Sequence, residues 1–114
     1  MNKTVCTQEV ELQGRRDQFQ VEELRQQQLL EKRQLPKKLK AEHKAQVAEL
    51  RKASRNKRTD NDREKLRQLD EQYVRKSQLE TELMNEKHEK SMETLRAELE
   101  ANMRDLQEIQ VNTV

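Results

Sequence analysis

Apolar residues recur along this chain at spacings of three, four, seven and eleven residues, which are the spacings of one face of an α-helix. Near the C-terminus, positions 92 to 109 alternate strictly by three and four residues, the heptad pattern of a coiled coil. Positions 66 to 73 begin with the same spacing in a different register. We therefore predict a helix-pairing seam with nine positions: Leu66, Leu69, Tyr73, Met92, Leu95, Leu99, Asn102, Leu106 and Ile109.

The seam must shift between Lys76 and His88, because the two registers disagree. Four-residue steps, from Leu79 to Leu83 and from Met84 to His88, relax a left-handed supercoil locally. Asn102 has two readings. It either fixes register and strand number at a core position, or it is an interfacial residue at a fraying helix end.

The N-terminal half is also helical in pattern, but its apolar face is thin. Leu12, Phe19 and Leu30 share one face, since seven and eleven residues both nearly complete whole turns. Further along, positions 39, 43, 47 and 50 follow spacings of four, four and three, a fragment of an eleven-residue repeat. A face this narrow predicts that the segment pairs with another helix.

Few residues interrupt these patterns. Gly14 weakens a helix interior and is a candidate helix start, while Pro36 predicts a kink or break. Residues 54–62, SRNKRTDND, contain no large apolar side chain, and Thr59 with Asp62 resembles a capping arrangement for a helix that starts near residue 60. We predict five segments: a frayed N-terminus (1–8), a helical segment kinked near Pro36 (9–53), a polar linker (54–61), a long helix (62–110) and a tail (111–114).

Composition points to the same fold class. Of the 114 residues, 40% are charged, and the chain has one Gly, one Pro and no Trp. So few turn residues and aromatics exclude β-rich folds, and a single glycine excludes a phosphate-cradling loop. We predict an all-α protein whose long helices form an elongated coiled coil, broken near Pro36 and at 54–62; the alternative is an antiparallel helical hairpin.

Charge is distributed unevenly along the chain. Residues 32–58 hold eleven Lys or Arg and two Glu, whereas residues 59–114 hold nine bases and fourteen acids. The basic face is either solvated, paired with acids, or a binding surface for nucleic acid or anionic membrane, although no aromatic residue interleaves it for stacking. Arg51-Lys52-Ala53-Ser54 resembles a basic-directed phosphorylation site at Ser54. The basic patch is Lys37, Lys38, Lys40, Lys44, Arg51, Lys52, Arg55, Lys57 and Arg58.

No catalytic constellation is present. The glycine-rich loop and the H-R-D and D-F-G motifs that position ATP and metal in protein kinases are absent, so we expect no catalysis and no cofactor. His43 and His88 are far apart in sequence and are expected to be solvated or to flank the seam. Cys6 is the only cysteine, and no run is apolar enough for a membrane span or a signal peptide. We expect a reduced, intracellular setting.

Three pieces of sequence, in order, resemble a known kinase tail: QLPKKLKAEHKAQVAELRK at 34–52, TDNDREK at 59–65 and EANMRDL at 100–106. They are similar to the C-terminal coiled-coil region of sterile-twenty-like serine/threonine kinases, called the polo kinase kinase region, of which Ste-like kinase and lymphocyte-oriented kinase are the nearest members. The likeness covers most of residues 15–110.

The resemblance implies a noncatalytic tail that self-associates in a cytoplasmic kinase whose family phosphorylates polo-like kinase and cytoskeletal linker proteins. Because the sequence contains no kinase domain, we expect the chain to be a fragment, a short isoform or an incomplete gene model. Its expected partner is a second copy or a full-length relative. The alternative function, from a different class, is a basic helical module that binds nucleic acid or anionic membrane.

Overall fold

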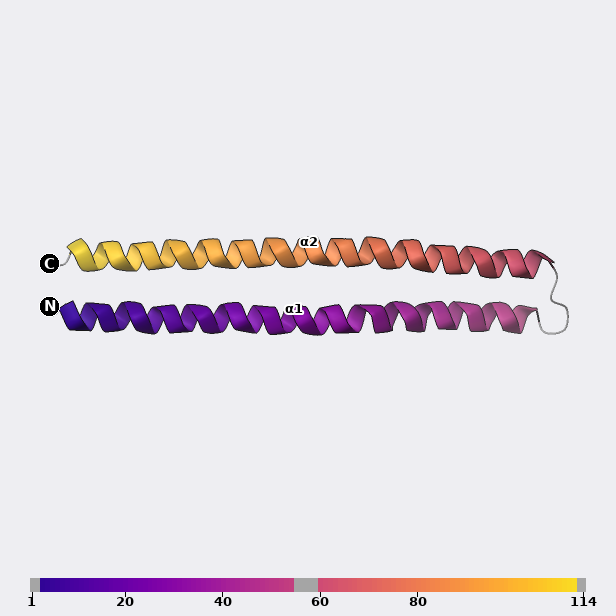
Figure 1. Cartoon of the computed structure of the whole chain (residues 1–114), viewed down its shortest axis with the longest axis horizontal. Coiled ribbons are helices and arrows are strands. Elements are labelled where there is room, and N and C mark those ends of the chain that lie inside the picture. Colours follow the sequence, from indigo (N-terminus) through magenta and orange to yellow (C-terminus); the bar gives the residue numbers. More distant parts are fainter. Residues whose placement is uncertain (1–2, 55–59, 113–114) are drawn as a thin grey trace. The chain divides into compact units, whose positions relative to one another are not determined.

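The computed structural model describes residues 3–54 and 60–112, and within them the chain is almost entirely helical. Helix α1 comprises Lys3–Ala53 and helix α2 comprises Asp60–Asn112 (Figure 1). No strand occurs in this part of the chain. The all-α prediction is therefore confirmed.

The helix ends lie where the polar stretch predicts them. α1 ends at Ala53, and both the backbone N–H and the hydroxyl of Ser54 donate to the Leu50 carbonyl, at 3.2 and 3.0 Å. α2 begins with Asp60 and Asp62 in its first turn, where carboxylates interact favourably with the positive end of the helix dipole. The predicted capping residue Thr59 lies outside the described residues.

The expected break at Pro36 is absent, because α1 continues through this residue. A proline inside a helix removes one backbone hydrogen bond and costs about 3 kcal/mol. Pro36 is itself exposed, while Leu35 is half-buried and Leu39 is only 3% exposed, so packing of these neighbouring residues offsets that cost. A kink at this position stays a prediction.

α1 also begins earlier than predicted, at Lys3 rather than at residue 9, and it includes Gly14 without interruption. The polar first residues have no apolar pattern from which a helix could be inferred. Their continuation in one helix with Val10 and Val21 is consistent with helix propagation being easier than helix nucleation.

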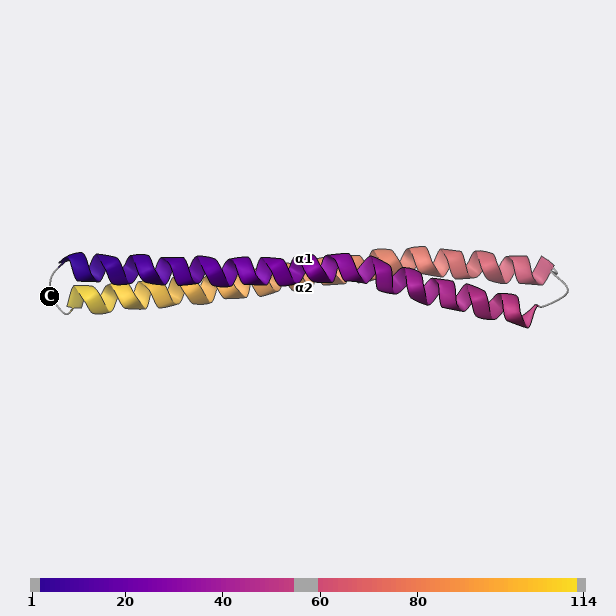
Figure 2. The same ribbon diagram turned by 90° about the horizontal axis from the view of Figure 1, so that it is seen from below.

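The chain divides into two compact units, each formed by part of α1 and part of α2. Unit 1 joins residues 1–29 with 87–114, and its described residues are 3–29 and 87–112. Within it, the two helical segments lie side by side and run in opposite directions (Figures 1 and 2). The side-chain amide of Gln28 donates to the backbone carbonyl of His88 at 2.9 Å, and Leu99 and His88 are buried at 9% and 6% exposure.

Unit 2 comprises residues 30–86 and contains the end of α1, residues 55–59 and the beginning of α2. Its helical segments are antiparallel, since Glu42 contacts Lys76 while Leu50 and Leu66 line one shallow hollow near the helix ends. Leu39 is its most buried apolar residue. Each unit thus has the helix pairing of the antiparallel hairpin that we considered as the alternative arrangement.

Candidate helix-pairing surface

Burial repeats every eleven residues along both helices. Eleven residues complete three turns at 3.67 residues per turn, so positions with this spacing stay on one side of a nearly straight helix. The repeat includes polar positions as well as leucines, which is why apolar residues alone do not show it. The buried or half-buried positions are Asp17, Gln28, Leu39 and Leu50 on α1, and Leu66, Ser77, His88 and Leu99 on α2.

Most of the predicted seam residues are buried or half-buried, and we call the sides of the helices that carry such residues the inward faces. Leu99 is buried, and Leu66, Leu69, Tyr73, Met92, Leu95 and Leu106 are half-buried. Asn102 and Ile109 are exposed, Ile109 by 64%, and Met103 is half-buried beside Asn102. The structure therefore follows the eleven-residue repeat near the C-terminus, and Asn102 lies outside the inward face of unit 1.

Several inward residues were not predicted. Ser77 and Gln28 are polar, so a search for apolar periodicity passes over them, although both lie eleven residues from another inward position. His88 is buried, so of the two expectations for it, a solvated side chain or a place beside the seam, the structure excludes the first. The hydroxyl of Ser77 is buried and has no hydrogen-bond partner within the described part of the chain. Unpaired buried hydroxyls reduce stability.

A polar cluster joins the two helices of unit 2. The Nε2 atom of His43 on α1 lies 2.8 Å from a carboxylate oxygen of Asp70 on α2, and the imidazole and the Tyr73 ring are 4.5 Å apart between centroids. Beside this contact, the ammonium of Lys76 on α2 donates to Glu42 on α1 at 3.1 Å. This hydrogen bond, together with the charge of Glu42, raises the pKa of Lys76. Since the partners come from different helices, these contacts help to define the pairing register.

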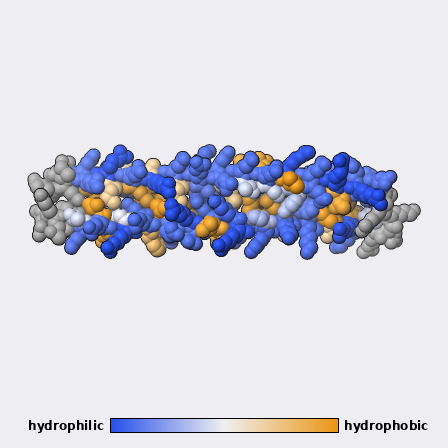
Figure 3. Space-filling model, viewed as in Figure 1, coloured by the Kyte–Doolittle hydropathy of each residue, from blue (hydrophilic) through white to orange (hydrophobic). Residues whose placement is uncertain are grey.

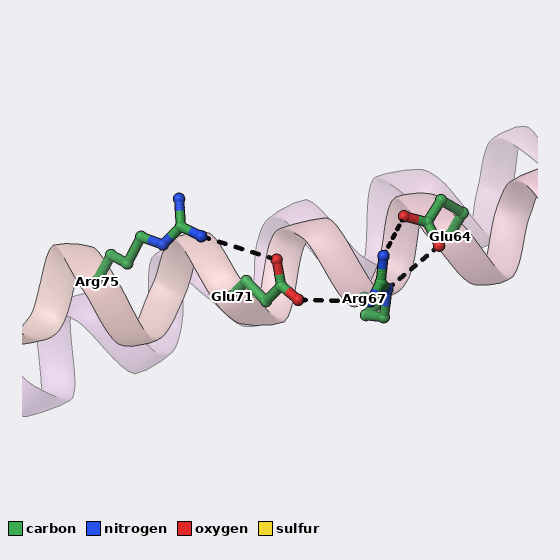
Figure 4. Close-up of polar contacts among 4 residues, drawn as sticks. All are labelled: Glu64, Arg67, Glu71 and Arg75. Atoms are coloured by element: carbon green, nitrogen blue, oxygen red, sulfur yellow. Dashed lines mark hydrogen bonds and ion pairs between the residues drawn. The ribbon is translucent and has the colours of Figure 1, made fainter.

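A chain of ion pairs stabilises the first turns of α2 (Figure 4). The Arg67 guanidinium donates two hydrogen bonds to Glu64, at 2.6 and 3.1 Å, and also lies 3.8 Å from Glu71. Glu71 lies 4.0 Å from Arg75, which is four residues further along the same helix. The hydrogen bonds from Arg67 lower the pKa of Glu64, and the same bonds raise the pKa of Arg67. These pairs are solvent-exposed, and each contributes little to stability.

The basic patch is exposed along α1. Lys37, Lys38, Lys40 and Lys44 are exposed, and none of them forms an ion pair within residues 7–54 and 60–109. Arg51 and Lys52 are also exposed. The remaining patch positions, Arg55, Lys57 and Arg58, lie outside the described residues.

Apolar side chains are exposed outside the inward faces as well. Figure 3 shows a largely hydrophilic surface with separate apolar patches. In unit 1, Phe19 is 65% exposed and lines a shallow hollow together with Arg15, Arg16, Gln20 and Glu23. In unit 2, Leu30, Val74, Leu79 and Leu83 are each more than half exposed. Such residues are available for a contact with another chain.

The candidate phosphorylation site, Ser54, is half-buried, and its hydroxyl donates to the Leu50 carbonyl. Addition of a phosphate would break that hydrogen bond. In the ranges with described side chains, no group of three or more His, Cys, Asp and Glu side chains is arranged to hold a metal ion. No described helix combines the length and the apolar character needed to cross a bilayer.

A family model described as Polo kinase kinase matches residues 3–113. The match covers nearly the whole chain. The chain belongs to the polo kinase kinase family. This confirms the resemblance that rested on the segments at 34–52, 59–65 and 100–106. No solved structure matches this member of the family.

Proposed function

We propose that this chain is a noncatalytic association segment in the tail of a sterile-twenty-like serine/threonine kinase, and that it pairs with another helical chain. The observation that carries the proposal is the family match over residues 3–113 together with the long, polar helices that the segment forms. The parent kinase would phosphorylate polo-like kinase and cytoskeletal linker proteins in the cytoplasm.

The small amount of burial supports a partner. Within the described residues only Leu39 and Leu99 are buried apolar residues, whereas eight large apolar side chains are 45% exposed or more. Apolar burial is the main favourable contribution to folding, at about 25 cal/mol per Å². A second chain that covers these side chains would add burial that the single chain lacks.

The test is a dilution series followed by analytical ultracentrifugation and circular dichroism. We expect the sedimentation coefficient and the helicity to rise together with concentration, because association and helix formation are coupled. A chain that remains monomeric at every concentration, both alone and when mixed with the tail of a full-length relative, contradicts the proposal.

The exposed lysines at 37, 38, 40 and 44 favour one alternative, a basic helical module for nucleic acid or anionic membrane. Neutralisation of phosphates by lysine makes such binding strongly salt-dependent. In that case a monomeric chain binds RNA or acidic vesicles, and the binding weakens as NaCl is raised from 50 to 200 mM.

A further inference from the structure

Two segments of the chain carry the same helical pattern with opposite charges. Residues 30–53 of α1 align without a gap with residues 79–102 of α2 when 49 is added to each number. Most inward positions coincide, since the buried Leu39 aligns with the buried His88, and the half-buried Leu50 aligns with the buried Leu99. Ala48-Glu49-Leu50 aligns with Ala97-Glu98-Leu99, an identical tripeptide. The outer faces of the two segments therefore correspond over most of their length.

On the outer face of each segment, five charged residues form a stripe along the helix, and matched positions of the two stripes carry opposite charges. On α1 this face carries five bases at spacings of four, three, four and seven residues, and on α2 it carries five acids at the same spacings. These spacings keep the side chains on one side of a helix. The basic stripe is Arg33, Lys37, Lys40, Lys44 and Arg51, and the acidic stripe is Glu82, Glu86, Glu89, Glu93 and Glu100.

Both stripes are available for a partner. All ten side chains are exposed, and none of them forms an ion pair in the described part of the chain. Glu86 lies four residues before Lys90 and Glu100 four residues before Arg104, a spacing that allows ion pairs within the helix, but neither pair is formed in the described residues. Each stripe extends over 18 residue steps, or about 27 Å along its helix at 1.5 Å per residue.

We propose that two copies of the chain associate with the basic stripe of one copy against the acidic stripe of the other, with the two helices parallel and offset by 49 residues. This inference rests on the proposed function and gives it a partner and a surface. In a symmetric dimer the contact is made twice, because each copy carries both stripes. Complementary stripes of this kind select partner and register more than they add affinity.

The exposed leucines favour the parallel register. The same offset of 49 residues aligns Leu30 with Leu79, which are 54% and 56% exposed. An antiparallel arrangement places four of the five bases opposite an acid. In that arrangement Lys37 does not lie opposite Glu86, and Leu30 does not lie opposite Leu79. The parallel register alone matches all five pairs and covers both leucines.

The first experiment exchanges charges in the full chain and measures self-association by sedimentation equilibrium at low salt. The variants K40E/K44E and E89K/E93K each place like charges opposite one another, and we expect each to weaken the association constant at least tenfold. The quadruple variant K40E/K44E/E89K/E93K restores opposite charges and is expected to associate like the wild type. A mixture of the two double variants is expected to form a heterodimer.

Matched controls carry the same changes in charge away from the stripes. Lys38 and Lys52 lie off the basic stripe, and Glu98 and Asp105 lie off the acidic stripe, and all four are exposed. We expect K38E/K52E and E98K/D105K to change the association constant less than threefold. Circular dichroism of every variant at high concentration checks that helicity is retained.

The second experiment tests the register by cross-linking between copies. In a Cys6→Ser background, one copy carries Leu30→Cys and the other Leu79→Cys, and oxidation of the mixture is expected to give a disulfide-linked heterodimer. The control pairs Leu30→Cys with Gln72→Cys. Gln72 is exposed on the same face of α2 as Leu79, but it lies seven residues, about 10.5 Å, from Leu79 along the helix. That separation exceeds the reach of a disulfide.

The outcomes separate the two proposals. Association that is unaffected by K40E/K44E and E89K/E93K, or equal cross-linking at residues 72 and 79, overturns the stripe contact and leaves the association function standing. A wild-type chain that stays monomeric alone and with a full-length tail overturns the association function, and the stripe contact with it.

Discussion

His43 of α1 and Asp70 of α2 are joined by a 2.8 Å contact between the imidazole Nε2 and a carboxylate oxygen. The two residues are 27 positions apart in sequence, so this contact constrains how the helical segments of unit 2 align. Asp70 is 59% exposed, and solvent therefore weakens the interaction.

We predict a small but measurable coupling between these two side chains. In a double-mutant cycle of His43→Ala, Asp70→Ala and the combined variant, the coupling free energy is expected to be about 0.3–1 kcal/mol. Thermal or urea unfolding followed by circular dichroism measures it. Strictly additive losses from the two single variants would show that the contact contributes nothing.

Leu39 is the most buried apolar residue, and Leu39→Ala is expected to lower the free energy of unfolding by about 2–3 kcal/mol. The loss combines lost apolar burial with the space left between the helices. Leu83→Ala is the matched control, since Leu83 is 54% exposed and its truncation should cost less than about 0.5 kcal/mol. Equal losses for both variants would mean that α1 and α2 do not pack as described.

Gly14 lies inside α1, and a methyl group added there meets no atom within 4 Å apart from the adjoining residues and backbone of its own helix. Alanine is preferred over glycine in a helix interior by about 1 kcal/mol, because it reduces the freedom of the unfolded backbone. Gly14→Ala is therefore expected to raise the free energy of unfolding by up to about 1 kcal/mol. The reverse change at the exposed Ala41, Ala41→Gly, should lower it by a similar amount.

Ser77→Ala is expected to stabilise the chain, because it removes a buried hydroxyl that has no hydrogen-bond partner in the described residues. Relief of such a group is worth about 1 kcal/mol, and alanine adds a few tenths through its helix propensity. Ser91→Ala controls for propensity, since Ser91 is also half-buried on α2. A gain at residue 77 no larger than at residue 91 would argue against the unpaired hydroxyl.

The contact between Glu64 and Arg67 predicts a dependence on pH. Hydrogen bonds from Arg67 lower the pKa of Glu64 from its ordinary value of 4.5, so folding favours the ionised carboxylate. The resulting stabilisation is complete above pH 4.5 and is lost as the pH falls through the lowered value in the folded chain. In thermal melts, the difference in midpoint between wild type and Glu64→Gln should shrink as the pH is lowered from 6 to 2. A difference independent of pH would contradict this.

Local chemistry made the two helix ends beside the polar stretch predictable. The polar stretch at 54–62 lacks the apolar side chains that hold a helix to a neighbour, and α1 ends at Ala53 while α2 begins at Asp60. The break predicted at Pro36 is absent, because the cost of a proline is local whereas the burial of Leu39 depends on α2, and the kink stays a prediction.

The inward faces were predictable only in part. Leu66, Leu95 and Leu99 follow from apolar spacing, and the structure places them inward. Asn102 and Met103 are adjacent in sequence, and either could continue the seam; a heptad repeat selects Asn102, whereas the observed eleven-residue repeat leaves Asn102 exposed and Met103 half-buried.

The sequence by itself determined that the chain is helical with a polar interruption at 54–62, since helix formation follows from residue propensity, apolar spacing and the scarcity of glycine and proline. Only the tertiary structure decided which residues of each helix lie inward and which partner each contacts, such as His43 with Asp70 and Gln28 with His88. The reason is physical: spacing fixes the direction of a side chain relative to its own helix axis, but burial depends on the position of a second helix.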